Sequence, residues 1–397
     1  MSQASGRKPV ADSDQRRLSE PKQQRSNDQA QINYSRSEGQ VLHSGDRQPG
    51  NASRQSQGTR KQTGRLELTE NEDAGKEVGG MEIDLKSNLS MREAFSKAIT
   101  EFGLKDKRVF TVAADSESRF GAFRKEAADR AFNVGIAEQN ATSIAAGLAF
   151  CGKIPFVTTY GTFMTMRACE QIRTDIAFAN LNVRIVGTNI GFSSDWLGFT
   201  HQALEDVSLM RSLPNMTVLV PADGEETYRL VEALINYEGP AYLRIRGTGQ
   251  EPHVESEDPI EIGKARKFRP GNDVTIIACG RMVHEAIQAS DQLAREGIGA
   301  RVLGVHTIKP LDEEAVLAAA AETKGLITVE EHSIIGGLGS AVAELTSASQ
   351  PVPVKRMGVN DQFGFPGKEE DLFAYFGLTA NHIVNEAKKL LEREASQ

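Results

Sequence analysis

Short apolar runs alternate with helical patterns from about residue 84 onwards, and this alternation constrains the fold more than any other feature. Each run has the length of a strand, and the segment between two runs is long enough for a crossover helix, which favours parallel strands. We therefore predict an α/β protein with two doubly wound, mainly parallel-sheet domains. The predicted strands are 109–115, 153–160, 183–189, 216–223, 241–247, 274–280, 300–310 and 325–331. The predicted helices are 91–102, 132–150, 163–180, 225–237, 282–296 and one that starts near residue 334.

The chain divides into four parts by composition. Residues 1–80 contain one aromatic residue, Tyr34, and are rich in Ser, Gln, Arg, Gly and Asp. Such a segment cannot bury enough apolar surface to offset its chain entropy, so we predict a disordered polar tail. A first domain follows at 84–250, then a polar linker at 251–273 and a second domain at 274–397.

Composition excludes several classes of protein. The formal net charge of −8 and the pI of about 5.6 argue against nucleic-acid binding. Three cysteines without a CxxC pair argue against disulfides or zinc and fit a reducing cytoplasm. Since no apolar run reaches the length of a membrane span, no membrane association is expected.

Candidate site residues follow the predicted strands of the first domain. In doubly wound sheets, ligands bind beyond the carboxyl ends of the strands. Asp115 ends the first strand, Asn189 ends the third, and Arg244 and Arg246 lie near the end of the fifth. Glu138 is an ionisable residue within a segment of small, apolar residues, where a carboxylate needs a partner. Taken alone, it is better explained as a surface glutamate or as a charge in the first turn of a helix.

Four segments in order carry a family resemblance. They are NVGIAEQN (133–140), TYGTFMTMRACEQIR (159–173), GFTHQALEDVSLMRSLPNMTVLVPADG (198–224) and AYLRIRG (241–247). Together they resemble the transketolase family, which uses thiamine diphosphate. The resemblance runs from about residue 86 to the end and implies a pyrimidine-binding domain followed by a transketolase C-terminal domain.

The resemblance implies a cofactor role for four residues. Glu138 matches the glutamate that hydrogen-bonds N1′ of the cofactor's aminopyrimidine, so we expect it to be catalytic. Phe163 matches the aromatic residue that packs on the pyrimidine ring. Met166 stands where transketolases often have a further aromatic residue, and Asp115 matches a strand-end residue that lines the cofactor pocket.

The resemblance also implies substrate contacts. His201 matches a histidine near the substrate's reacting oxygen. Arg92, and either Arg246 or Arg244, match arginines that bind the substrate phosphate, a role that suits the bidentate guanidinium. Ser118 lies in the same strand-end segment as Asp115.

The loop after Asn189 departs from the family pattern. Transketolases usually have a histidine at the position of Asn189 and an aspartate at that of Leu197. Asp195 is the nearest carboxylate to the second position. Because the family residues bind sugar hydroxyls and phosphate, the donor or acceptor sugar is expected to differ from pentose phosphates.

The family's GDG motif, which helps to hold Mg²⁺ on the cofactor's diphosphate, is absent from the chain. The resemblance therefore implies a C-terminal subunit of a split transketolase. A separate N-terminal subunit would carry the GDG motif and the metal, in an α2β2 heterotetramer.

Three other interpretations remain open. One is the β subunit of a 2-oxoacid dehydrogenase E1 component, and another is a relative of deoxyxylulose-phosphate synthase. The THQALED and PADG segments favour transketolase over the former, and the latter usually carries its own GDG motif. The third is an inactive flavodoxin-like binding module, against which the joint presence of Glu138, Phe163 and His201 argues.

We predict that the natural protein begins at Met81 rather than Met1. Lys76, Glu77 and Val78 can be encoded as AAG-GAG-GTG, which contains a bacterial ribosome-binding sequence, and two glycine codons then separate it from the codon of Met81. The intact mass of the protein from its native source tests this. A mass that includes residues before Met81 would refute the prediction.

Overall fold

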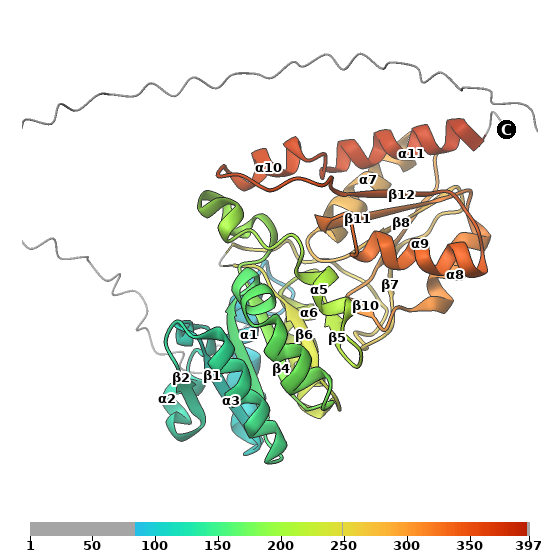
Figure 1. Ribbon diagram of the computed structural model, residues 1–397. Helices are drawn as coiled ribbons and strands as arrows, with labels where there is room; N and C mark the ends of the chain where they lie inside the picture. The colour runs from blue at the N-terminus through green and yellow to red at the C-terminus, as the bar shows by residue number, and fades with distance from the viewer. Residues whose placement is uncertain (1–83, 248, 395–397) are drawn as a thin grey trace, which may run out of the picture. The chain divides into compact units, whose positions relative to one another are not determined.

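A computed structural model describes residues 84–247 and 249–394 (Figure 1). The predicted tail at 1–80 and the predicted start at Met81 lie outside the described residues. Within the described part of the chain, no helix combines the length and apolar character needed to cross a bilayer.

The first sheet has seven strands in the order β10-β5-β6-β4-β3-β1-β2, and all but β10 run parallel to their neighbours. Consecutive residues of β4 face opposite sides: Ile185 packs in one core cluster and Val186 in another. This two-sided burial is typical of a doubly wound sheet. The strands are β1 (Val109–Ala113), β2 (Ala131–Asn133), β3 (Ile154–Tyr160), β4 (Arg184–Thr188), β5 (Thr217–Leu219), β6 (Ala241–Arg244) and β10 (Thr307–Lys309).

Helices cover both faces of this sheet. On one face lie α1 (Met91–Lys105) and α6 (Gly224–Asn236). Ser90 begins α1 with a capping box to Glu93, and the predicted N-cap of α6, Asp223, accepts a hydrogen bond from the backbone of Glu226. On the other face lie α3 (Glu138–Phe150), η4 (Phe163–Arg167), α4 (Cys169–Gln171), η5 (Ile172–Ala177) and α5 (Asp206–Ser212). Shorter helical turns are η2 (Glu117–Phe120), α2 (Phe123–Glu126), η3 (Ala128–Arg130) and η6 (Gly191–Thr200).

The second sheet has the order β12-β11-β8-β9-β7, parallel except for the edge strand β7. Figure 1 shows α8 and α9 on one side of it and α7 and α11 on the other. The strands are β7 (Arg266–Arg269), β8 (Val274–Ala278), β9 (Ala300–Gly304), β11 (Leu326–Ser333) and β12 (Val354–Val359). The helices are α7 (Met282–Arg295), α8 (Glu313–Glu322), α9 (Leu338–Ser349), α10 (Glu369–Tyr375) and α11 (Ala380–Glu394). The predicted fold class is confirmed.

Two predicted helices are wrong in detail. Instead of a helix over 132–150, the chain forms β2, turns at Gly135 with a φ of 71°, and begins α3 at Glu138. Glycine adopts this left-handed conformation without steric cost. Instead of a regular helix over 163–180, η4 and η5 are π-helical. Such widened turns are rare and occur often at functional sites.

Two segments form strands at places that the sequence did not predict. The predicted strand at 300–310 divides into β9 and β10, and β10 pairs antiparallel with β5 of the first sheet. Residues predicted as linker form β7, whose sequence RKFR has only one apolar residue, Phe268. An edge strand with charged side chains has no two-sided apolar pattern, so its sequence resembles that of a loop.

A buried ion pair connects α5 to the centre of the first sheet. The Asp206 carboxylate accepts hydrogen bonds from Arg244 Nε and Tyr242 Oη, both at 2.7 Å. Arg244 also donates to the backbone oxygens of Ala203 and Glu331, and thus reaches β11 of the second sheet. Burial alone would raise the pKa of Asp206, but the charge of Arg244 and these hydrogen bonds outweigh it and lower the pKa.

Asp206→Asn should lower the free energy of unfolding by about 3–5 kcal/mol, because it leaves the buried Arg244 charge unpaired. A carboxylate with a lowered folded-state pKa stabilises the fold above its unfolded pKa. The difference should therefore hold from neutral pH to about pH 4 and shrink as the pH falls further.

Urea denaturation of the two proteins measures this difference. Asp291→Asn is the matched control, because Asp291 pairs with Arg269 at the surface with 45% of its side chain exposed, and its loss should cost under about 1 kcal/mol. Equal effects of the two substitutions would contradict the prediction.

Candidate active site

The candidate residues gather at the carboxyl ends of β1, β3 and β4, which are neighbours in the first sheet. The residues that follow β1 and β4 have left-handed backbone conformations, with φ of 53° at Asp115 and 54° at Asn189. Asp and Asn tolerate this conformation better than other non-glycine residues, and it turns the chain sharply away from the strand end. A cluster of side chains can therefore assemble above this edge of the sheet.

Glu138 is the first residue of α3 and is buried, with 2% of its side chain exposed. No side chain caps this helix end, so the carboxylate lies beside unpaired backbone amides and the positive end of the helix dipole. Arg167 Nη1 donates a hydrogen bond to Glu138 Oε1 at 2.8 Å. The sequence predicted that this buried carboxylate needs a partner, and the partner is an arginine from η4.

An aromatic group connects this ion pair to His201. The guanidinium of Arg167 lies over the ring of Phe163, 4.4 Å from its centroid. The Phe163 ring contacts the His201 ring edge to face at a centroid distance of 5.0 Å, and His201 contacts Tyr160 in the same way at 5.2 Å. Glu138, Phe163 and His201, predicted from separate motifs, therefore belong to one contiguous cluster.

His201 follows η6 and is half-buried. Burial lowers the pKa of its imidazole, which favours the neutral form at neutral pH. Thr200 Oγ1 lies 2.9 Å from Nδ1, and Thr162 Oγ1 donates to the His201 carbonyl. Among the described residues, Nε2 has no hydrogen-bond partner. This nitrogen is the one available to a ligand.

Two arginines without carboxylate partners extend the cluster. Arg119 is buried over Tyr160 and donates from Nη2 to Asn189 Oδ1 at 3.0 Å. Arg92 donates from Nη2 to Ser118 Oγ at 3.1 Å. Burial and the nearby charge of Arg92 lower the pKa of Arg119, and its buried Nε has no hydrogen-bond partner. Among the described residues, no carboxylate forms an ion pair with either arginine. Two adjacent, unneutralised guanidinium groups favour an anionic ligand.

The second domain holds the loop that precedes His201. Glu331 Oε1, on β11, accepts a hydrogen bond from the backbone N–H of Phe192 at 2.6 Å. Gly191 has a φ of 55° and lies against this carboxylate, where a Cβ would come within 2.3 Å of it. Gln202 donates to the carbonyl of Phe365 at 3.0 Å. The position of His201 therefore depends on both domains.

The remaining predicted site residues make no hydrogen bond, ion pair or ring contact with this cluster among the described residues. Arg244 is buried with Asp206, and Arg246 is buried among three carboxylates, from Glu251, Glu331 and Glu369. Both guanidinium groups are thus neutralised in the interior, because acidic residues far apart in sequence meet them there. Asp195 accepts a hydrogen bond from the backbone of Trp196, whereas Asp115 and Met166 are exposed.

Three members of the cluster were missed from the sequence: Tyr160, Arg119 and Arg167. Tyr160 is the last residue of β3, and Arg119 lies four positions after Asp115. Arg167 lies four positions after Phe163, a spacing that places two side chains on the same side of a helix. For Arg119 and Arg167, the spacing of four positions from a predicted site residue was a signal that could have identified them.

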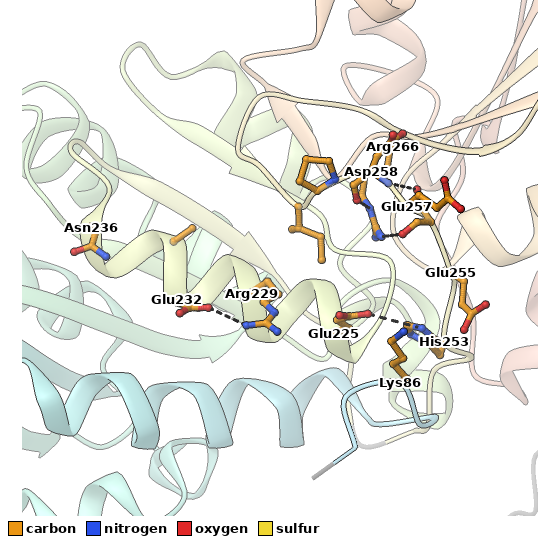
Figure 2. Close-up of a pocket in the computed structure, with 14 residues that line it drawn as sticks. Lys86, Glu225, Arg229, Glu232, Asn236, His253, Glu255, Glu257, Asp258 and Arg266 are labelled. Carbon is orange, nitrogen blue, oxygen red and sulfur yellow. Dashed lines mark hydrogen bonds and ion pairs between the residues drawn. The ribbon is translucent and has the colours of Figure 1, made fainter. Parts of the chain in front are cut away.

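A pocket of about 700 Å³ lies elsewhere, between α6 and residues 253–260 (Figure 2). Figure 2 shows that Arg229 pairs with Glu232 and that His253 faces Glu225. None of its lining residues belongs to the cluster around Glu138. Within the described residues, no group of three or more His, Cys, Asp or Glu side chains is arranged to hold a metal ion.

Comparisons with known proteins agree with this architecture. Residues 87–247 match the family described as transketolase, pyrimidine binding domain, and residues 263–383 match transketolase, C-terminal domain. The chain is 42% identical over 306 residues to a 6-deoxy-6-sulfo-D-fructose transketolase subunit SqwH from Clostridium sp. (strain MSTE9), covering 77% of this chain and 95% of the relative. It is 38% identical to an apulose-4-phosphate transketolase subunit from Phocaeicola vulgatus, covering 77% and 98% of the two chains.

A solved structure described as a split gene transketolase, inactive beta4 tetramer, is also similar. Its chain is 41% identical, with a TM-score of 0.70, and the match covers 77% of this chain and 99% of that one.

Two mainly parallel sheets, with candidate site residues at the strand ends of the first, define a two-domain α/β protein. The matches over both domains specify which one: the chain belongs to the transketolase family and carries its pyrimidine-binding and C-terminal domains.

His201→Ala should reduce kcat of the assembled enzyme about 100-fold, because it removes a ring nitrogen that is free to contact substrate. The melting temperature of the chain should change little, since the ring is only half-buried and its neighbours Tyr160 and Phe163 remain. Steady-state kinetics and a thermal melt measure the two effects. A large fall in melting temperature with normal turnover per folded molecule would show that the histidine is structural.

Proposed function

We propose that this chain is the C-terminal subunit of a two-chain transketolase. It transfers a two-carbon ketol unit from an anionic ketose to an aldose, together with a separate N-terminal subunit. The single observation that carries the proposal is the joining of Glu138, Phe163 and His201 in one cluster at the strand ends.

The residues of the cluster fit the aminopyrimidine half of thiamine diphosphate, the cofactor that the family uses. Glu138 is a buried carboxyl group that can share a proton with a ring nitrogen, and the Phe163 ring provides an aromatic face beside it. Within the described residues, the counter-charge of Glu138 comes from Arg167, whose side chain is 47% exposed. A ligand that displaces this exposed arginine can therefore reach the carboxyl group and the ring from solvent.

When bound, thiamine diphosphate supplies the nucleophilic carbon and the electron sink for cleaving the C–C bond beside the ketose carbonyl. Glu138 holds a proton shared with N1′ of the pyrimidine. Phe163 orients the ring, and the edge contacts from Tyr160 and Phe163 fix the plane of His201. His201 then presents Nε2 to an oxygen of the substrate.

We assign the anionic group of the substrate to Arg92 and Arg119. Their guanidinium groups lack carboxylate partners among the described residues, and Ser118 and Asn189 hold them in place. The names of the two similar subunits reported above refer to a sulfonated sugar and to a phosphorylated sugar, respectively. A substrate with a phosphate or sulfonate matches this charge, whereas Arg244 and Arg246 are already paired with carboxylates.

The partner is proposed to be an N-terminal transketolase subunit with a GDG motif that holds the diphosphate and Mg²⁺. Supporting this, the chain lacks GDG, and it matches nearly the whole length of relatives that are themselves named subunits. We propose an α2β2 heterotetramer. A cytoplasmic location is proposed from the three cysteines, which lack a CxxC pair.

Reconstitution tests the proposal. The chain alone should be inactive. A mixture with a GDG-bearing partner, thiamine diphosphate and Mg²⁺ should transfer a ketol unit from a ketose phosphate, and should transfer it less well from the unphosphorylated ketose.

Glu138→Gln preserves the shape of the side chain but removes the proton relay. The same mixture made with this variant should therefore lose at least about 100-fold in kcat.

Coupled assays of aldose consumption and ketose formation measure the transfer. Robust turnover by the isolated chain would refute the two-chain assignment, and near-normal turnover of the variant would refute the role of Glu138. Decarboxylation of pyruvate without ketol transfer would instead support the deoxyxylulose-phosphate-synthase or the 2-oxoacid dehydrogenase interpretation.

A further inference from the structure

Arg167 makes two contacts at once in the cluster. One N–H of its guanidinium donates to Glu138 Oε1 at 2.8 Å, and the planar guanidinium lies over the face of Phe163 at 4.4 Å. Arginine stacks on aromatic rings and pairs with carboxylates through the same planar group. A single side chain therefore engages the carboxylate and the aromatic face together.

These are the two contacts that the proposed function assigns to the aminopyrimidine. That ring is also flat, also stacks on Phe163, and also hydrogen-bonds Glu138, through the proton shared with N1′. The face of Phe163 beneath the guanidinium cannot hold both groups, since stacked planes must approach to within van der Waals distance. The rings of Tyr160 and His201 also contact the Phe163 ring, at centroid distances of 5.8 and 5.0 Å.

We propose that Arg167 is a gate residue, whose guanidinium occupies the pyrimidine subsite and must leave Glu138 and Phe163 before the cofactor binds. The inference rests on the proposed function for the position of the pyrimidine. It adds a competitor within the chain itself, which sets the affinity for the cofactor and holds the charge of Glu138 paired until the cofactor arrives.

The location of Arg167 suits this movement. Glu138 is 2% exposed, whereas the side chain of Arg167 is 47% exposed. The arginine can therefore swing into solvent without leaving a buried charge of its own, and its long side chain has the rotamer freedom to do so. Only Glu138 loses a partner, and a proton taken up from solvent and shared with N1′ of the arriving pyrimidine replaces the guanidinium.

The widened helical turn explains why Arg167 reaches the site. Phe163 and Arg167 are the first and last residues of the π-helical segment η4, four positions apart. This spacing brings the arginine back over the ring of Phe163. Arg173, in the neighbouring segment η5, is exposed and has no ion pair among the described residues.

The test is the dissociation constant of thiamine diphosphate, measured by isothermal titration calorimetry on the complex of this chain with its N-terminal partner, in the presence of Mg²⁺. Arg167→Ala should bind thiamine diphosphate about five- to tenfold more tightly than wild type, because the competing contacts are those of a half-exposed ion pair and a cation–π pair. Arg173→Ala is the matched control and should leave the constant unchanged. Arg167→Lys, which keeps the charge but lacks the planar group, should fall between wild type and Arg167→Ala.

A permanent structural role for Arg167 predicts the opposite sign. If Arg167→Ala binds thiamine diphosphate as weakly as wild type or more weakly, with the melting temperature of the chain unchanged, the gate is refuted while the proposed function stands. If the wild-type complex binds no thiamine diphosphate at all, the proposed function falls and the gate with it.

Discussion

The buried arginine–carboxylate network at the end of β6 is the interaction on which the site depends. Arg246 is surrounded by carboxylates from Glu251, Glu331 and Glu369, and Glu331 also accepts the backbone N–H of Phe192. A buried guanidinium without these partners would be too costly to keep, so the first sheet must pack against β11. The loop that presents His201 takes its position from the same carboxylate.

Charge balance separates the interior from the site. In the network at the end of β6, each buried guanidinium meets a carboxylate, as Arg244 meets Asp206. The buried Arg184 instead donates to three backbone carbonyl groups. At the strand ends positive charge is in excess, because Arg92 and Arg119 lie close together without an acidic partner among the described residues. Burying charge without compensation is unfavourable, and for this reason we assign an anionic ligand to these two arginines rather than to Arg244 and Arg246.

Prediction from sequence succeeded where the signal was local. Strand β3 and the body of the small-residue helix α3 follow from their own residue patterns. It did not find the partners of Arg246, which lie 5, 85 and 123 residues away along the chain. The RIRG motif shows two positive charges after a strand but cannot show which side chains neutralise them. The edge strand β7 was missed for a related reason, since its pairing with β9 leaves little trace in an RKFR sequence.

Local sequence patterns were enough to establish the alternating α/β architecture, because hydrophobic period acts over a few residues. The candidates Glu138, Phe163 and His201 came from the resemblance of short segments to the transketolase family. What each charged group faces was settled by packing alone. Packing turned Arg244 and Arg246 into the interior, paired Glu138 with Arg167, and brought Arg119 beside Arg92. Electrostatic roles depend on neighbours in space and on the exclusion of water, and both arise only when segments far apart in the chain pack together.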